Sequence, residues 1–94
     1  MQTTYRLRHN AAKHRYEFDL GDAEAFIEYV ETPRALLLIH TEVPPRYEGR
    51  GIGGKLVRAV LEELREQGVR IVPQCSFIAL YIRRHPEFAA MVDA

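Results

Sequence analysis

A glycine-rich stretch, Arg46-Tyr47-Glu48-Gly49-Arg50-Gly51-Ile52-Gly53-Gly54-Lys55, separates two regions of different sequence pattern. It joins a nearly continuous apolar run, 35–43, to an amphipathic segment that begins at Ile52, so a strand is expected to pass into a helix here. Four of the six positions 49–54 are glycine, which is unfavourable in the first turn of a helix. Glycines there leave backbone N–H groups open to an anion, which the helix dipole also favours. The stretch predicts a phosphate-bearing ligand, with positive charge from Arg46, Arg50 and Lys55. The other explanation, a tight turn and close helix-on-sheet packing, requires fewer glycines.

The residues before this stretch have the pattern of antiparallel strands. Positions 15–20 alternate apolar and charged side chains, and Gly21-Asp22 is a two-residue hairpin signal. The return strand is expected at 23–30, and a short edge strand at 5–8. The run 35–43 is typical of a central strand covered on both faces.

The residues after the stretch change to a helical period. An apolar stripe runs from Ile52 to Leu64, and Gly68 is a natural helix end. A short strand is expected at 69–72, parallel to the central one. A second helix is expected at 76–84, with a last helical turn near 88–92. The predicted fold is α+β: an antiparallel meander leading into a central strand, followed by helix, strand and helix.

Composition limits the class of protein. The chain has 94 residues, enough for a single domain over 1–94. Its 13 Lys and Arg balance 13 Asp and Glu, so no overall basic field would hold nucleic acid or an anionic membrane. A single Cys allows no internal disulfide. Neither a membrane-spanning run nor a signal-peptide layout is present, and a cytoplasmic location is the expectation.

Three kinds of ligand match a glycine-rich loop between a strand and a helix. A nucleotide-hydrolase phosphate loop requires Ser or Thr after Gly-Lys, but Leu56 stands there. The dinucleotide pattern G-x-G-x-x-G is matched by Gly49, Gly51 and Gly54, yet residues 70–72 lack the acidic side chain expected about 20 positions further on. The third candidate is an acyl-coenzyme A.

The third interpretation rests on a family resemblance. Arg46-x-x-Gly49-x-Gly51, followed by Ile52-Gly53, resembles the pyrophosphate loop of the GNAT acetyltransferase superfamily, as Val43-Pro44-Pro45 resembles its strand end. The likeness extends to His40-Thr41-Glu42-Val43-Pro44, to Pro73-x-Cys75-Ser76-Phe77 with Tyr81, and to His85-Pro86-Glu87. This ordered set is similar to the small, single-domain GNAT-like proteins of the YjdJ type and spans most of the chain. The resemblance implies a GNAT-like fold with a splayed mixed sheet.

The resemblance also implies a co-substrate and the residues that would hold it. The pyrophosphate of acetyl-coenzyme A would bind the backbone of 49–54, and its pantetheine arm would pair with main-chain groups of 41–43. The acetyl thioester would point into the gap where the central strand and the strand before Pro73 diverge. The expected binding residues are Thr41, Val43, Arg46, Gly49, Arg50, Gly51, Ile52, Gly53, Gly54 and Lys55. The helices that complete the acceptor site in larger relatives are not expected here, so the acceptor remains unidentified.

Four residues are candidates for the chemistry. Cys75 is expected at a helix start, where the dipole lowers the pKa of a thiol, and its thiolate could carry the acetyl group; a buried packing role is the alternative. In the small family this Cys has been proposed as catalytic. His40 and Glu42 share one strand face and could remove a proton from an amine, unless they only cap a solvated strand end. The resemblance suggests that Tyr81 could hydrogen-bond the departing thiolate; packing is the alternative. His and Cys spacing predicts no metal site.

Two classes of function therefore compete. The first is an acetyl-CoA-dependent N-acetyltransferase that acts on an amine, either directly or through a Cys intermediate. The second is a module that binds coenzyme A without chemistry, as a sensor or partner protein. The sequence leaves the oligomeric state open.

Overall fold

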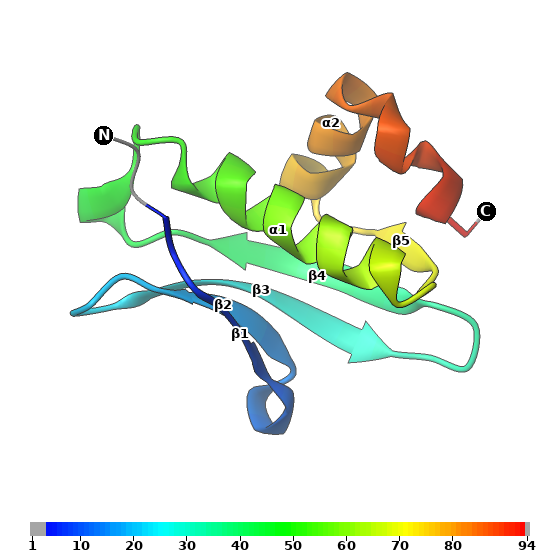
Figure 1. Cartoon of the computed structure of the whole chain (residues 1–94), viewed down its shortest axis with the longest axis horizontal. Helices are drawn as coiled ribbons and strands as arrows, with labels where there is room; N and C mark the ends of the chain where they lie inside the picture. The colour runs from blue at the N-terminus through cyan, green and yellow to red at the C-terminus, as the bar shows by residue number, and fades with distance from the viewer. Residues whose placement is uncertain (1–3, 94) are drawn as a thin grey trace.

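The structure is a computed structural model that describes residues 4–93. Its elements, in chain order, are β1 (Leu7–Asn10), η1 (Ala11–Lys13), β2 (Arg15–Asp19), β3 (Glu24–Glu31), β4 (Leu36–Glu42), η2 (Pro45–Tyr47), α1 (Ile52–Glu66), β5 (Ile71–Pro73), α2 (Ser76–Arg84) and η3 (Pro86–Met91). The five strands form one sheet in the order β1-β2-β3-β4-β5, antiparallel except for the parallel pair β4 and β5 (Figure 1). The predicted α+β fold, a meander followed by helix, strand and helix, is confirmed.

The hairpin between β2 and β3 forms as the sequence predicts. The N–H of Leu20 donates to the carbonyl of Ala23 at 2.9 Å, which closes the two-residue turn. Gly21 has a φ of 99°, a conformation that side chains of L-residues disfavour. The first strand is Leu7–Asn10 rather than the predicted 5–8, so His9 pairs with Tyr16.

The first helix packs its apolar stripe on the sheet. The buried residues of α1 are Ile52, Leu56, Val57, Val60, Leu61 and Leu64, at the spacing of one helical face. They meet the inward side chains of the strands, which include Tyr16, Phe18, Ala25, Ile27, Tyr29 and Leu38, in one hydrophobic core. Gly68 follows the helix with a φ of 71°, and β5 then returns parallel to β4.

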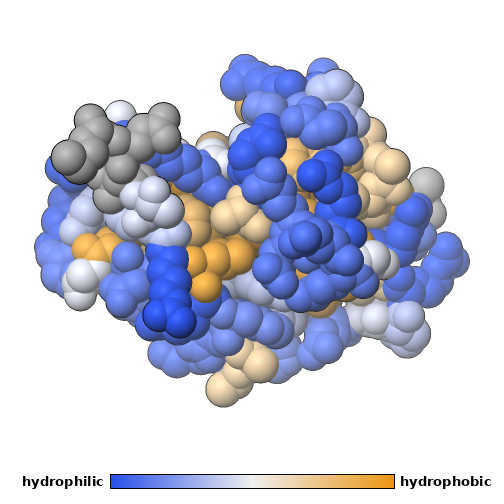
Figure 2. All heavy atoms as spheres, viewed as in Figure 1, coloured by the Kyte–Doolittle hydropathy of each residue, from blue (hydrophilic) through white to orange (hydrophobic). Residues whose placement is uncertain are grey.

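The expectation that both faces of the central strand are covered was wrong. α1 and α2 lie on the same side of the sheet (Figure 1), and on the other side Val30 and Ile39 remain 44% and 40% exposed. The apolar run around β4 arises partly from a local irregularity described below, rather than from two buried faces. Polar and charged side chains cover most of the face seen in Figure 2.

The uncovered side of the sheet contains a buried carboxylate. Glu17 is 1% exposed, although the alternation of β2 places it on the polar side. Its oxygens accept hydrogen bonds from Nε and Nη2 of both Arg8 and Arg15, at 2.7–3.0 Å, and from the amide of Asn10 at 3.2 Å. Arg15 also covers the ring of Phe26, at 4.0 Å from its centroid. On this side, charged side chains rather than a helix therefore shield the strands from solvent.

The chain end described by the structure lies along β5. The expected helical turn near 88–92 is a 3-10 segment, η3, that starts earlier, at Pro86, and buries Phe88. Beyond it, Val92 forms a parallel bridge with Ile71, and the N–H of Asp93 donates to the carbonyl of Ile71 at 2.8 Å. No helix within residues 4–93 has the length and apolar character needed to cross a bilayer.

Candidate active site

The two parallel strands separate halfway along β4. β5 pairs with β4 only from Leu36 to Leu38, where Pro73 is the last partner. Proline has no N–H to continue the ladder, and the N–H groups of Gln74 and Cys75 both turn to the carbonyl of Leu38, at 3.0 Å each. The rest of β4 pairs with β3 alone. The predicted splay is therefore present, and among residues 4–93 it leaves one edge of the second half of β4 without a neighbouring strand.

A bulge in β4 lies at this same point. Leu38 pairs with Tyr29 and His40 with Glu28, so Ile39 is an extra residue without a partner in the register. An inserted residue of this kind turns the following side chains relative to those before it. Ile39 and His40 consequently both point away from the helices, and both are exposed.

The bulge brings Thr41 to the helix side, next to the cysteine. Thr41 pairs with Ile27, which is fully buried under the helices, and directly opposed residues share a face. The Thr41 hydroxyl oxygen lies 3.4 Å from the Cys75 sulfur. From the sequence, Thr41 was expected in the site for its main chain only. The side-chain contact depends on the bulge, for which the sequence carries no clear signal.

The surroundings of Cys75 favour its thiolate. Cys75 is half-buried and is the N-cap of α2, although its side chain makes no capping hydrogen bond. Burial acts to raise the pKa of the thiol, but the hydrogen bond with Thr41 and the nearby backbone N–H groups of Ile78 and Phe77, which favour the thiolate although neither forms a full capping hydrogen bond, outweigh it. The pKa of Cys75 is therefore below its ordinary value. A thiol with these neighbours is suited to act as a nucleophile.

His40 and Glu42 form a separate pair. The Nε2 of His40 and a carboxylate oxygen of Glu42 are 2.7 Å apart, and both side chains are about half exposed. Since they alternate with Thr41 along β4, they face the uncovered side of the sheet while Cys75 faces the helices. The four side chains thus occupy the two faces of one strand segment, at the point where β5 leaves it.

Backbone conformation explains why two positions of the loop are glycine. Gly49 and Gly51 have φ values of 80° and 75°, and Gly51 is the N-cap of α1. A Cβ at either position would meet nothing within 4 Å. Conformation, rather than crowding within the protein, therefore selects glycine at both positions. The first-turn N–H groups of α1 have no partners within the helix, as at any helix start, and Ile52 contributes only its main chain because its side chain is 98% buried.

The next two glycines differ from each other. A Cβ on Gly53 would lie 3.0 Å from the Phe77 ring, so that position holds α1 close to α2. A Cβ on Gly54 would meet only Tyr81, at an ordinary 3.8 Å. Three of the four glycines therefore have a reason within the fold itself, which sequence reasoning had underestimated. Gly54 is the one that neither backbone conformation nor packing requires.

The loop is fastened to the β2–β3 turn. The Tyr47 hydroxyl donates to Asp22 at 2.7 Å and to the carbonyl of Leu20 at 3.2 Å. Arg46, which was expected to bind a phosphate, forms an ion pair with Asp22 at 2.6 Å. The guanidinium of Arg50 lies over the Tyr47 ring, 5.3 Å from its centroid. The hydrogen bond from Tyr47 lowers the pKa of Asp22. Tyr47 is an anchor that sequence analysis missed, although it stands inside the quoted motif.

Tyr81 lies between the two helices. Its hydroxyl accepts a hydrogen bond from the Nε of Arg58 at 2.8 Å, and Arg58 also pairs with Glu87 at 3.0 Å. Its ring stacks on His85 with centroids 3.9 Å apart. Among residues 4–93, these contacts link Tyr81 to α1 and η3, and none links it to Cys75. The structure accordingly brings Cys75 and Thr41 together but leaves Tyr81 in a different cluster.

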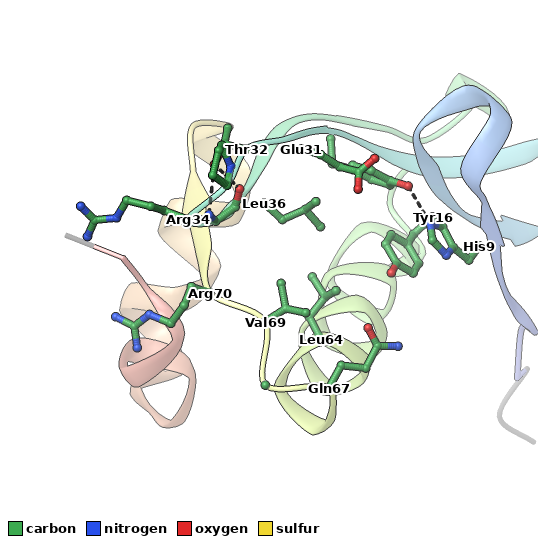
Figure 3. A pocket seen from close by; sticks show the side chains of 14 residues that line it. His9, Tyr16, Glu31, Thr32, Arg34, Leu36, Leu64, Gln67, Val69 and Arg70 are labelled. Atoms are coloured by element: carbon green, nitrogen blue, oxygen red, sulfur yellow. Dashed lines mark hydrogen bonds between the residues drawn. The ribbon is translucent and has the colours of Figure 1, made fainter.

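A cavity in the described part of the chain lies at the other end of the sheet. It has a volume of about 410 Å³ and is lined near the start of β4 and the end of α1 by residues that include His9, Tyr16, Leu36, Leu64 and Val69 (Figure 3). None of the site residues predicted from the sequence lines it. The described residues show no cluster of three His, Cys, Asp or Glu side chains suited to a metal ion.

Comparisons with known proteins agree with this arrangement. A sequence profile of the family described as GCN5-related N-acetyl-transferase matches residues 15–91. Protein NATD1 of Mus musculus is 32% identical over 85 residues, which cover 86% of this chain and 76% of that protein. The Homo sapiens protein of the same name is also 32% identical over 85 residues, with 86% and 74% covered. In Gallus gallus the match is 39% over 59 residues, or 63% of this chain and 53% of that protein.

The matched span runs from β2 into η3 and so includes the glycine loop, the splayed strands and Cys75. It contains the resemblance on which the sequence analysis rested, and it supports an acetyltransferase-like role. The chain belongs to the GCN5-related N-acetyltransferase family.

Proposed function

We propose that this protein is an acetyl-CoA-dependent N-acetyltransferase that transfers the acetyl group to an amine through Cys75. The observation that carries the proposal is the contact of Cys75 with Thr41 where β4 and β5 diverge. The start of α1 lies next to this point, because Gly53 faces Phe77, two residues after Cys75. A nucleophile and an anion-binding helix start are thus adjacent.

Different residues of the site would bind different parts of the co-substrate. The first-turn N–H groups of α1, over 52–54, would hold a pyrophosphate, with Lys55 on the same turn. The unpaired edge of β4 up to Val43 offers main-chain groups for an extended arm. Arg46, which pairs with Asp22, and Arg50, which lies over the Tyr47 ring, would place positive charge beside the loop. Acetyl-CoA supplies the acetyl group as a thioester.

The transfer can be written with the side chains present. The Cys75 sulfur forms a bond to the acetyl carbon while the bond from that carbon to the coenzyme sulfur breaks, and the electron pair leaves with the coenzyme. An amine nitrogen then bonds to the same carbon, and the electron pair of the broken carbon–sulfur bond returns to Cys75. The proton that the amine loses passes to water, and His40 or Glu42 receives it only through that water, because both side chains face the other side of β4 from Cys75. The Tyr81 hydroxyl accepts from Arg58, so its own O–H proton is available to donate to the departing coenzyme sulfur.

Labelled acetyl-CoA tests the proposal. Incubation of the whole chain without an amine should place the label on Cys75, and addition of polyamines or lysine peptides should remove it as acetylated amine. Competition between coenzyme A and NAD should favour coenzyme A. Preference for NAD would contradict the ligand, and amine acetylation that never labels Cys75 would contradict the covalent step.

A second candidate follows from the uncovered face of the sheet. His40 and Glu42 lie on that face, where no helix of the described residues encloses an acceptor. A module that binds coenzyme A without turnover matches this observation. Tight coenzyme A binding with no acetylation of any amine in a broad panel would favour it over the enzyme.

Gly54 provides a specific prediction. Gly54→Ala should weaken coenzyme A binding by about tenfold, or about 1.4 kcal/mol, because it adds a side chain beside the first-turn N–H groups. The same change should leave stability unchanged or raise it by about 0.5–1 kcal/mol, since alanine favours the helix and the methyl group has room. Calorimetric titration and urea unfolding measure the two effects. Unchanged affinity in a stable variant would contradict the assignment of this loop.

A further inference from the structure

The two helix starts touch through a bare backbone and an aromatic ring. A Cβ on Gly53 would lie 3.0 Å from Cζ and 3.2 Å from Cε2 of Phe77, and 3.7 Å from Cγ2 of Val43. Distances near 3.0 Å leave no room for a methyl group without movement of the ring. Phe77 is in the first turn of α2, and Cys75 caps that turn. The contact therefore joins the loop that begins α1 to the turn that presents the thiol.

Phe77 contributes little to the core itself. The ring is 46% exposed, whereas the other two apolar anchors of α2, Ile78 and Ile82, are 0% and 7% exposed. The ring therefore contributes little to the core, and what distinguishes it is its close approach to Gly53. The ring lies against Gly53, which belongs to the candidate site.

The first turn of α2 is held by the fully buried side chain of Ile78 and by contacts on either side of it. Its N-cap, Cys75, provides no capping hydrogen bond, and no acidic residue lies in the first turn. On one side, the N–H of Cys75 is bonded to Leu38 of β4. On the other side, the ring of Phe77 rests on Gly53. Together with the buried side chain of Ile78, these two contacts position the first turn, and the Cys75 sulfur with it, between β4 and α1.

We propose that Phe77 is a positioning residue, whose ring against Gly53 fixes the first turn of α2 and holds the Cys75 sulfur at Thr41. The proposal rests on the proposed function, in which Cys75 carries the acetyl group. It assigns Gly53 a role in positioning the thiol, in addition to any role in binding a pyrophosphate. It explains why a glycine is needed at a position of α1 that has an ordinary helical conformation.

A change in thiol reactivity is the consequence that can be measured. The Thr41 hydroxyl and the first-turn N–H groups oppose the effect of burial on the thiol. If the first turn shifts, these groups are displaced while the sulfur stays partly buried. Thiolate formation should then need a higher pH.

Alkylation of the apo protein tests this directly. Cys75 is the single cysteine of the chain, so the rate of iodoacetamide reaction against pH reports on it alone. In Phe77→Ala and in Gly53→Ala the midpoint of the profile should rise by about one pH unit, which lowers the rate at neutral pH up to about tenfold. Phe77→Leu, which keeps most of the apolar volume, should shift it in the same direction by less.

The double variant shows whether the ring carries the effect. Gly53→Ala should have no further effect in the Phe77→Ala background, because the added methyl group has no ring to displace. Leu80→Ala is the matched control for lost apolar surface, at 41% exposure on the same helix. Gly54→Ala is the matched control for an added methyl group, and both controls should keep the wild-type alkylation profile.

Three outcomes would overturn the proposal. The first is an unshifted profile in Phe77→Ala and Gly53→Ala proteins that circular dichroism shows to be folded. The second is an effect of Gly53→Ala that is equally large without the ring, and the third is an equal shift in the Leu80→Ala control. Alkylation requires no acetyl transfer, so these results are independent of whether the proposed acetyltransferase activity is found.

Discussion

Cys75→Ala is expected to lower acetyl transfer to an amine by a factor on the order of 10³ or more, as losses of a covalent nucleophile do. The sulfur is the only group in the described structure that lies at the splay with a lowered pKa. Alanine leaves the start of α2 in place, because the side chain of Cys75 makes no capping hydrogen bond. Coenzyme A affinity should therefore remain within about threefold of wild type, or about 0.6 kcal/mol.

Steady-state rates with a lysine peptide and a titration with coenzyme A separate these two quantities. Thr41→Val is the companion variant, since it removes the hydroxyl that contacts the sulfur and keeps the shape of the side chain. Its rate at neutral pH should fall about tenfold and recover at higher pH, because only the thiolate fraction is affected. Cys75→Ala protein that transfers acetyl at the wild-type rate would show that the amine attacks the thioester directly.

Much of the fold could be predicted because local patterns and long-range packing agree. The second helix was predicted at 76–84 and observed as Ser76–Arg84, since an apolar face and Pro86 mark its extent. The β2–β3 hairpin followed from alternation and from Gly21. The splay followed from the family resemblance and has a local cause in Pro73, which ends the ladder.

The site was less predictable because it depends on pairing between distant residues. The bulge at Ile39 is a property of the register with β3, and it alone places Thr41 beside Cys75. A run of apolar letters cannot distinguish a strand with two covered faces from one with an extra outward residue. The contact of Gly53 with Phe77 has the same character, since the two residues come from different helices.

The charged network of the uncovered face leads to the second large prediction. Glu17→Gln should destabilise the protein by about 2–4 kcal/mol at neutral pH, as removal of one partner from a buried ion pair does. The variant leaves Arg15, whose side chain is only 16% exposed, facing a neutral amide with fewer acceptor sites. A total stability of about 5–15 kcal/mol is usual for a domain, so the loss is a large fraction of it.

The pH dependence of this loss has a defined sign. Burial acts to raise the pKa of Glu17, but hydrogen bonds from Arg8, Arg15 and Asn10 outweigh it and hold the pKa below its ordinary value. The ionised carboxylate thus stabilises the fold at pH values above the unfolded pKa of about 4.3, and this contribution is lost as pH falls through the lower folded pKa.

Urea unfolding of wild type and Glu17→Gln, from pH 7 down to pH 3, measures the difference in their free energies of unfolding. This difference should become smaller as the pH falls. Glu24→Gln is the control on the same face. Its side chain is 42% exposed and lies 3.9 Å from Arg15, and an exposed pair of this kind contributes about 0–1 kcal/mol. Two results would contradict this expectation: a loss of unfolding free energy in Glu17→Gln that stays constant with pH, or a loss that is no larger than in Glu24→Gln. Either result would mean that the Arg8–Glu17–Arg15 cluster stabilises the sheet through packing rather than through the charge of Glu17.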